Sequence, residues 1–375
     1  MGLLTGALPD FPWDTLVPFA ERARAHPDGI VDLSVGTPVD PTPAAVRQAL
    51  ADAADAPGYP TTHGTLALRE AVAAWFARRR GVPGLDPAAV LPTIGSKELV
   101  AWLPSLLGLG SGDVVVHPQI AYPTYDVGAR LAGATPLPAD DVEAWAHRTD
   151  VRLVWINSPS NPTGRVLDAA GLAAVVDAAR RIGAVVASDE CYALLAWDEP
   201  WTTTGVPSVL HPSVCGPTHE GVLAVHSLSK QSNLAGYRAA FVAGDPAIVG
   251  QLLEVRKHAG LMVPAPVQAA MTVALGDDAH VAEQRERYGR RRRALLGALD
   301  AAGFEVDGSP AGLYLWARAA GAGQDCWQTV ADLAELGILV APGSFYGPAG
   351  ARHVRIALTA SDDAVARAVA RLSGA

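Results

Sequence analysis

The 375-residue sequence has few cysteines, little charge and no long apolar run, and each shortage excludes a class of protein. Its cysteines, Cys191, Cys215 and Cys326, are odd in number and far apart, which excludes a disulfide framework and the spacing of a metal site. We expect reduced, buried thiols and no metal. No segment approaches the ~18 apolar residues of a membrane span, and no basic start precedes an apolar stretch. The composition predicts a soluble, cytoplasmic protein without a membrane partner.

The charge pattern argues against a nucleic-acid partner, because only 18% of the residues are charged and the net charge is −9. One basic run, Arg290–Arg293, lies in a helical pattern from about 280 to 301. We expect this run to form a solvated helix face.

The length exceeds that of a usual single core, and half of the residues are hydrophobic, so we expect two domains with well-packed cores. Helical patterns alternate with short apolar, mostly β-branched runs through the middle of the chain. The predicted strands are 112–116, 152–156, 184–187, 222–225 and 239–243, with a strong helix at 169–181. This alternation predicts an α/β fold with a largely parallel central sheet and helices on both faces.

The pattern changes after the long helix, where strands at 312–316 and 353–358 alternate with helices near 326–336 and 361–373. We expect a smaller α+β domain, completed by the N-terminal residues. The predicted boundaries are 45–275 for the large domain and 1–44 with 276–375 for the small one. The glycine-rich run at 108–112 precedes a predicted strand, so we interpret it as a turn and not as a dinucleotide fingerprint.

Lys230 lies at the end of a predicted buried strand, in the sequence Ser227-Leu228-Ser229-Lys230, and Arg238 follows eight positions later. Burial lowers the pKa of a lysine, and such an amine can form a Schiff base with a carbonyl compound. Ser227 and Arg238 supply a hydroxyl and a guanidinium, which suit a phosphate. Alone, Lys230 fits a surface lysine in a Ser-rich turn better than it fits a catalytic site. The set predicts a site for pyridoxal 5'-phosphate, held by its aldehyde and its phosphate.

Two further strand ends carry polar residues. Asn161, in the turn Asn157–Gly164, offers an amide to a ligand, although an ordinary Pro/Gly turn has the same pattern. Asp189 follows an apolar strand directly and needs a cationic partner, which a protonated pyridine nitrogen provides. Tyr192 lies three residues later, where it can donate to the phenolic oxygen of that ring. A helix cap or a structural ion pair is the alternative for Asp189.

Two upstream segments complete the pattern. Gly95, Ser96 and Lys97 open an apolar helical run, and small residues at a helix start leave N–H groups free for an anion. Tyr122, fixed by the following proline, can stack on a flat ring or pack in the core.

In this order the motifs resemble those of the fold-type I, class I/II aminotransferases, and the resemblance runs from about Leu33 to about Leu372. It implies that Lys230 is the Schiff-base lysine and proton shuttle and that Asp189 pairs with the ring nitrogen. By the same resemblance, Tyr192 and Asn161 contact the phenolic oxygen and Tyr122 stacks on the ring. The phosphate ligands implied are Gly95, Ser96, Lys97, Ser227 and Arg238.

The resemblance also implies substrate ligands and a homodimer. Arg355 matches the arginine that binds the substrate α-carboxylate, Gly36 matches a glycine at the substrate, and Asn161 is expected to contact the substrate as well as the cofactor. Tyr59 matches the tyrosine that family members lend to the phosphate site of the neighbouring subunit. The sequence departs from many members at Ile120, where they have proline.

The segment from His226 to Arg238 is most similar to actinobacterial succinyldiaminopimelate aminotransferases, which implies glutamate and N-succinyl-2-amino-6-oxopimelate as substrates in lysine and diaminopimelate biosynthesis. A broader aspartate or aromatic aminotransferase and a pyridoxal-dependent C–S lyase remain alternatives. A non-enzymatic regulator is disfavoured, because such regulators carry an extra DNA-binding domain for which this chain has no room. The sequence does not place a cation for a distal carboxylate; Lys97, Arg130 and Arg165 are the candidates.

Overall fold

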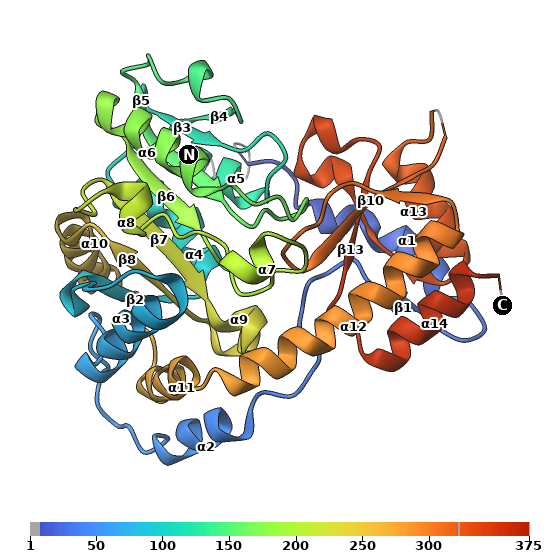
Figure 1. Ribbon diagram of the computed structural model, residues 1–375, viewed down its shortest axis with the longest axis horizontal. Coiled ribbons are helices and arrows are strands. Elements are labelled where there is room, and N and C mark those ends of the chain that lie inside the picture. The colour runs from blue at the N-terminus through green and yellow to red at the C-terminus, as the bar shows by residue number, and fades with distance from the viewer. Residues whose placement is uncertain (1–7, 322, 375) are drawn as a thin grey trace, which may run out of the picture.

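The computed structural model describes residues 8–321 and 323–374. Its centre is a seven-stranded sheet in the order β2-β8-β7-β6-β5-β3-β4 (Figure 1). The strands are β2 (Val90–Ile94), β3 (Val114–His117), β4 (Thr135–Pro138), β5 (Val151–Asn157), β6 (Val185–Asp189), β7 (Val222–Ser227) and β8 (Ala239–Gly244). All neighbouring pairs are parallel except those of β8, which runs antiparallel to both β2 and β7. The predicted α/β class with a largely parallel sheet is confirmed.

Both faces of this sheet are buried, as a mostly parallel sheet requires. Alternate side chains of one strand pack in two different clusters: Val222 and Ala224 lie in one, and Leu223 and Val225 lie in the other. On the first face pack α2 (Ala44–Asp52), α3 (Leu66–Arg80), α6 (Ala169–Ile182), α8 (Pro212–Cys215) and α11 (Ala265–Gly276). On the second face pack α4 (Ser96–Leu106), α5 (Thr124–Leu131) and α10 (Pro246–Ala259).

A second core lies around a smaller antiparallel sheet of order β12-β13-β10-β9. Its strands are β9 (Phe304–Val306), β10 (Tyr314–Ala319), β12 (Ala341–Pro342) and β13 (Val354–Ala357), and β1 (Val31–Asp32) pairs in parallel with β11 (Ile338–Leu339). The helices here are α1 (Val17–Arg24), α12 (Ala279–Ala301), α13 (Cys326–Glu335) and α14 (Asp362–Leu372). Figure 1 shows α12 extending from α11 beside the large sheet to α14. The boundaries of the two predicted domains stay a prediction.

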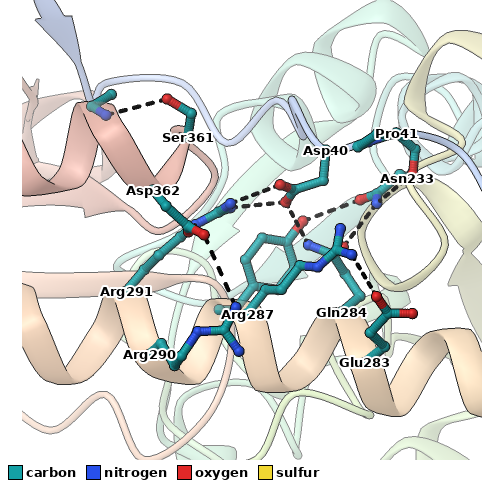
Figure 2. A network of polar contacts seen from close by, with 12 residues as sticks. Asp40, Pro41, Asn233, Glu283, Gln284, Arg287, Arg290, Arg291, Ser361 and Asp362 are labelled. Atoms are coloured by element: carbon teal, nitrogen blue, oxygen red, sulfur yellow. Dashed lines mark hydrogen bonds and ion pairs between the residues drawn. The ribbon is translucent and has the colours of Figure 1, made fainter.

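The long helix α12 contradicts one expectation. The pattern of Arg290–Arg293 predicts a solvated face, yet the side chain of Arg291 is 3% exposed and contacts Asp40 at 2.7 Å and Asp362 at 2.6 Å (Figure 2). Arg290, by contrast, is half exposed. The prediction is wrong for Arg291 because its acidic partners are far away in the sequence and cannot be recognised from a local pattern.

Three remaining expectations concern composition. Cys191, Cys215 and Cys326 are free and buried, as predicted. Over residues 8–321 and 323–374 no helix is both long and apolar enough to cross a bilayer. In the same residues no three or more acidic, histidine or cysteine side chains gather as they do around a metal ion.

Candidate active site

The site forms where three parallel strands end. The carboxyl ends of β5, β6 and β7 carry Asn157, Asp189 and Ser227, and Asn157 pairs with Asp189 in the sheet register. Ligands of open α/β sheets bind at this edge. A cavity of about 690 Å³ opens here. Of the predicted site residues, those lining it are Gly36, Ser96, Lys97, Tyr122, Asn161, Asp189, Tyr192, Ser227, Lys230, Arg238 and Arg355.

Lys230 lies on α9 (Leu228–Gln231), a single turn that follows β7 directly. Its ammonium donates a short hydrogen bond to the carbonyl oxygen of Gly36, from the N-terminal segment. Burial, with a further contribution from the nearby cation of Arg355, lowers the pKa of Lys230 from 10.5 to about 8. A larger fraction of this amine is therefore neutral and nucleophilic near neutral pH than for an ordinary lysine.

Asp189 is a buried carboxylate that lacks a cation. Its oxygens accept hydrogen bonds from the Cys191 N–H at 3.1 Å and from the Tyr125 hydroxyl at 3.0 Å. No lysine, arginine or histidine among the described residues forms an ion pair with it. Burial raises the pKa of Asp189, although the two hydrogen bonds oppose this rise. A cationic ligand group facing Asp189 would restore its charged form.

Arg355 is the opposite case, a buried cation without an acidic partner among residues 8–321 and 323–374. It lies on β13, is 2% exposed, and donates to the side-chain oxygen of Asn161 at 3.0 Å and to the Ser34 carbonyl at 2.6 Å. Its guanidinium lies 4.0 Å from the centre of the Tyr314 ring, and its Nε has no hydrogen-bond partner. This arrangement leaves the guanidinium suited to a carboxylate ligand.

An anion cradle lies at the start of α4. Gly95 is the N-cap of this helix with φ of 79°, and no side chain caps the first N–H groups. A Cβ at Gly95 would lie 2.2 Å from a guanidinium nitrogen of Arg238, and the positive φ of this residue also favours glycine. The Ser227 hydroxyl, bonded to that of Ser229 at 2.8 Å, lies in the same cavity. Free helix N–H groups beside a guanidinium suit a phosphate.

Two other predicted site residues, Gly36 and Tyr192, lie against Tyr314, which the sequence pattern did not identify as a site residue. A Cβ at Gly36 would lie 2.2 Å from the Tyr314 hydroxyl. A glycine at this position therefore allows the N-terminal segment to lie close to the Tyr314 ring. The hydroxyl of Tyr192 lies 3.3 Å from that of Tyr314. Both tyrosines lie in the cavity wall with Tyr122.

Tyr59 does not line the cavity, and its side chain is 96% exposed. Tyr59 therefore makes no contact with the cavity of its own chain.

Sequence reasoning missed several residues of the wall besides Tyr314. The sequence pattern assigns no role to Tyr125, although this side chain donates to Asp189. Asn157 accepts from the N–H of Asn161 at 2.7 Å and so shapes that turn. Phe11 and Trp13 come from the N-terminal segment, for which the sequence offered no signal.

These features fit pyridoxal phosphate. Asp189 needs a cation such as a protonated pyridine nitrogen, and the start of α4 with Arg238 offers an anion cradle. Lys230 is an amine of lowered pKa in the wall of the same cavity. Fold and site together define a pyridoxal-phosphate enzyme that acts on a carboxylate-bearing substrate. The protein-family model described as "Aminotransferase class I and II" matches residues 28–372. The chain therefore belongs to that family, whose members depend on pyridoxal phosphate.

Individual relatives carry more particular names. The chain is 61% identical over 373 residues to "Probable aminotransferase Rv1178" of Mycobacterium tuberculosis, covering 99% of this chain and 87% of that protein. It is 58% identical over 366 residues to "4-dedimethylamino-4-oxo-anhydrotetracycline transaminase OxyQ" of Streptomyces rimosus, covering 98% and 99%. Among solved structures, a probable N-succinyldiaminopimelate aminotransferase from Thermus thermophilus matches with a TM-score of 0.86 and 29% identity over 97% of this chain and 100% of that one.

Proposed function

We propose that this aminotransferase exchanges an amino group between glutamate or 2-oxoglutarate and N-succinyl-2-amino-6-oxopimelate. The main observation in support of this proposal is the buried guanidinium of Arg355, which has no acidic partner in the described chain. Such a guanidinium suits a substrate α-carboxylate. The succinylated substrate is supported by the resemblance of the segment around Lys230 and by the name of the Thermus thermophilus structure. Amino acids and 2-oxo acids are the substrates of the family as a whole.

The residues proposed to hold the cofactor divide by the part they contact. Lys230 would hold its aldehyde carbon, Asp189 its ring nitrogen, and Asn161 and Tyr192 its phenolic oxygen. Tyr122 would cover the ring. The proposed phosphate ligands are Gly95, Ser96, Lys97, Ser227 and Arg238, with Tyr59 of a second subunit. When bound, pyridoxal phosphate supplies an electron-withdrawing ring that stabilises negative charge on the substrate α-carbon.

The protein's own residues then orient the substrate and move one proton. Arg355 would fix the α-carboxylate by two N–H groups. Gly36 lets the N-terminal segment lie close to the Tyr314 ring in the cavity wall. With the cofactor bound, the Lys230 amine would take the proton from the substrate α-carbon and deliver it to the carbon that carries the cofactor's aldehyde, and its lowered pKa keeps more of the amine neutral for this role near neutral pH. The rings of Tyr192, Tyr314 and Tyr122 line the cavity and would shield the reacting atoms from water.

A second candidate substrate is a bulky ring ketone. The relative OxyQ is named for 4-dedimethylamino-4-oxo-anhydrotetracycline, and aromatic side chains, Phe11, Trp13 and Tyr122, line the cavity of this chain. A broader aspartate or aromatic aminotransferase stays an alternative, since Arg355 would accept any α-amino acid.

The test compares kcat/KM for succinyldiaminopimelate, acetylornithine, aspartate, phenylalanine and the OxyQ-type ketone, each paired with glutamate or 2-oxoglutarate. We expect a preference of at least ~100-fold for the succinylated substrate, about 2.7 kcal/mol of transition-state discrimination. A higher value for any of the others would overturn the substrate and leave the reaction class standing.

A further inference from the structure

A second chamber of about 630 Å³ adjoins the active-site cavity. Phe11, Trp13, Lys97 and Tyr122 line both spaces and so form the boundary between them. The first cavity, about 690 Å³, has to hold the cofactor together with the reacting end of the substrate. A long substrate needs further room, and the volume of the second chamber suits a ligand of small-molecule size.

The wall of the second chamber is mainly apolar and aromatic. Phe11 and Trp13 come from the segment that leads into α1, and Phe345 packs against Trp13 with ring centres 5.3 Å apart. Pro123, the N-cap of α5, and Val127, in the first turns of that helix, also line the chamber. An alkyl chain would be buried favourably on such a surface.

Lys97 is the cation of this boundary. Its ammonium lies 5.6 Å from the centre of the Phe11 ring and 5.7 Å from that of Tyr122, and no acidic side chain in residues 8–321 and 323–374 pairs with it. Of the other candidates for a distal cation, Arg130 is bound to Asp126 at 2.6 Å, and Arg165 lines neither space.

The remaining titratable groups of the chamber wall do not replace Lys97. Asp126 is neutralised by Arg130, and Asp10 is exposed. His117 donates through Nδ1 to the Pro118 carbonyl at 2.9 Å, and burial lowers the pKa of His117 below its usual value, so the ring is neutral near pH 7. Lys97 is therefore the unpaired positive charge available in the described part of this wall.

We propose that this chamber is the subsite for the far end of an extended acyl substrate and that the Lys97 ammonium binds its terminal carboxylate. The proposal rests on the proposed function and names the residue that recognises the succinyl group. Lys97 contributes to the anion cradle through its backbone N–H, at the second position of α4, and its side chain extends to the aromatic boundary.

The experiment compares N-succinyldiaminopimelate with its carboxamide analogue, in which the terminal carboxylate of the succinyl group becomes an uncharged amide of the same size. A charge-assisted hydrogen bond predicts that the wild type prefers the carboxylate by about 10- to 100-fold in kcat/KM. In Lys97→Met this ratio should fall to about one, mainly through a higher KM for the carboxylate. Because the ratio is taken within one variant, general damage to the phosphate site cancels.

A second pair of variants tests the chamber itself. Val127→Trp should reduce kcat/KM for the succinylated substrate at least about tenfold by filling the space, while the reaction with glutamate stays unchanged. Val127→Ala is the matched control and should keep both reactions. This inference would be overturned if Val127→Trp left kcat/KM for the succinylated substrate unchanged. It would also be overturned if Lys97→Met kept the preference for the carboxylate over the carboxamide. Failure of the wild type to use the succinylated substrate at all would instead overturn the proposed function.

Discussion

At the scale of single residues, the site combines two buried charges of opposite sign that lack partners in the described chain. Asp189 has no cation and Arg355 has no anion, and Lys230, on a turn after β7, lines the same cavity. Unpaired buried charges are unfavourable in a protein without its ligands. They are accounted for if a cationic ring and a carboxylate complete both pairs.

The first prediction uses the scarcity of lysine, since the chain contains only Lys97, Lys230 and Lys257. Borohydride reduction of the cofactor-loaded protein should attach the cofactor to Lys230 alone. Lys230→Ala should carry no label, because no other lysine lies in the same position, whereas Lys257→Ala should be labelled like the wild type. Mass spectrometry of the peptides decides, and label on Lys97 or Lys257 would refute the assignment.

The second prediction concerns pH. Because the pKa of Lys230 is about 8 in the cofactor-free protein, its neutral form increases with pH up to about 8 and is nearly complete above it. Stopped-flow measurement of cofactor attachment should therefore give a rate that rises about tenfold per pH unit below that value and then levels off. A rise that continued to about pH 10.4, the ordinary lysine value, would show that burial does not act on this amine.

The third prediction removes the substrate clamp. Arg355→Gln should cost about 2–5 kcal/mol of transition-state binding, so kcat/KM for glutamate should fall at least about 30-fold. Borohydride labelling of Lys230 should still occur in this variant, which separates a substrate role from general unfolding. Arg318→Gln, on the neighbouring strand β10 and paired with Asp307, is the control and should behave like the wild type. Equal losses in both variants would contradict a specific role of Arg355.

At the scale of elements, a buried ion pair fastens the N-terminal segment to α12. Asp40, four residues after Gly36, accepts from Arg291 at 2.7 and 2.8 Å and from Gln284 at 2.7 Å. Gln284 in turn accepts from Asn233, on the loop that follows Lys230, at 3.0 Å (Figure 2). The segment that carries Gly36 and the loop after Lys230 are thus held to the same helix.

The fourth prediction follows from this network. Arg291→Met should lower the free energy of unfolding by about 3–5 kcal/mol, because it leaves the carboxylate of Asp40 buried without its partner. Arg290→Met, one position away and half exposed, should change it by less than about 0.5 kcal/mol. Urea denaturation at neutral pH measures both, and equal effects would show that Arg291 is a surface charge after all.

The same pair has a pH dependence whose sign can be stated. Burial opposes the ionisation of Asp40, but hydrogen bonds from Arg291 and Gln284 outweigh it and hold the pKa of Asp40 below its ordinary value. The pair's contribution to stability is therefore complete above the unfolded value of about 3.9 and is lost as the pH falls through the lower folded value. The stability difference between wild type and Asp40→Asn should shrink in acid.

At the scale of the whole molecule, Tyr59 is 96% exposed and does not line the cavity of its own chain. We predict a homodimer in which each Tyr59 donates to the phosphate site of its partner. Lys230→Ala and Tyr59→Phe would each be impaired alone. A refolded mixture should regain activity, since one site of the mixed dimer then has both native residues. No recovery in the mixture would place Tyr59 in its own subunit or outside the site.

Much of this architecture could be predicted from the sequence because short apolar runs ending in polar residues mark buried strands. The apolar run at 222–225 predicts a strand, and β7 extends two residues further to Ser227. The antiparallel direction of β8 could not be predicted, because an apolar strand has the same composition in either direction. The edge strand β4 was missed, since Pro136 and Pro138 argue against a strand in the interior of a sheet.

The site was predictable where neighbours in sequence form it, as in Ser227–Lys230, and not where the fold joins distant segments. Tyr314 contacts Gly36 across most of the chain length, and it contacts Arg355 from the paired strand β10. Phe11 and Trp13 reach the cavity from the N-terminus. No local pattern records such contacts, so the sequence could name Lys97, Arg130 and Arg165 as candidate distal cations but could not choose among them.

The measurement that tests the central claim most directly is a single turnover of the cofactor-loaded enzyme with glutamate and no acceptor. Transamination predicts one equivalent of 2-oxoglutarate per active site, with the amino group retained on the enzyme until an acceptor is added. Release of ammonia with a 2-oxo acid, or of carbon dioxide, would instead identify a lyase or a decarboxylase and contradict the proposed transamination.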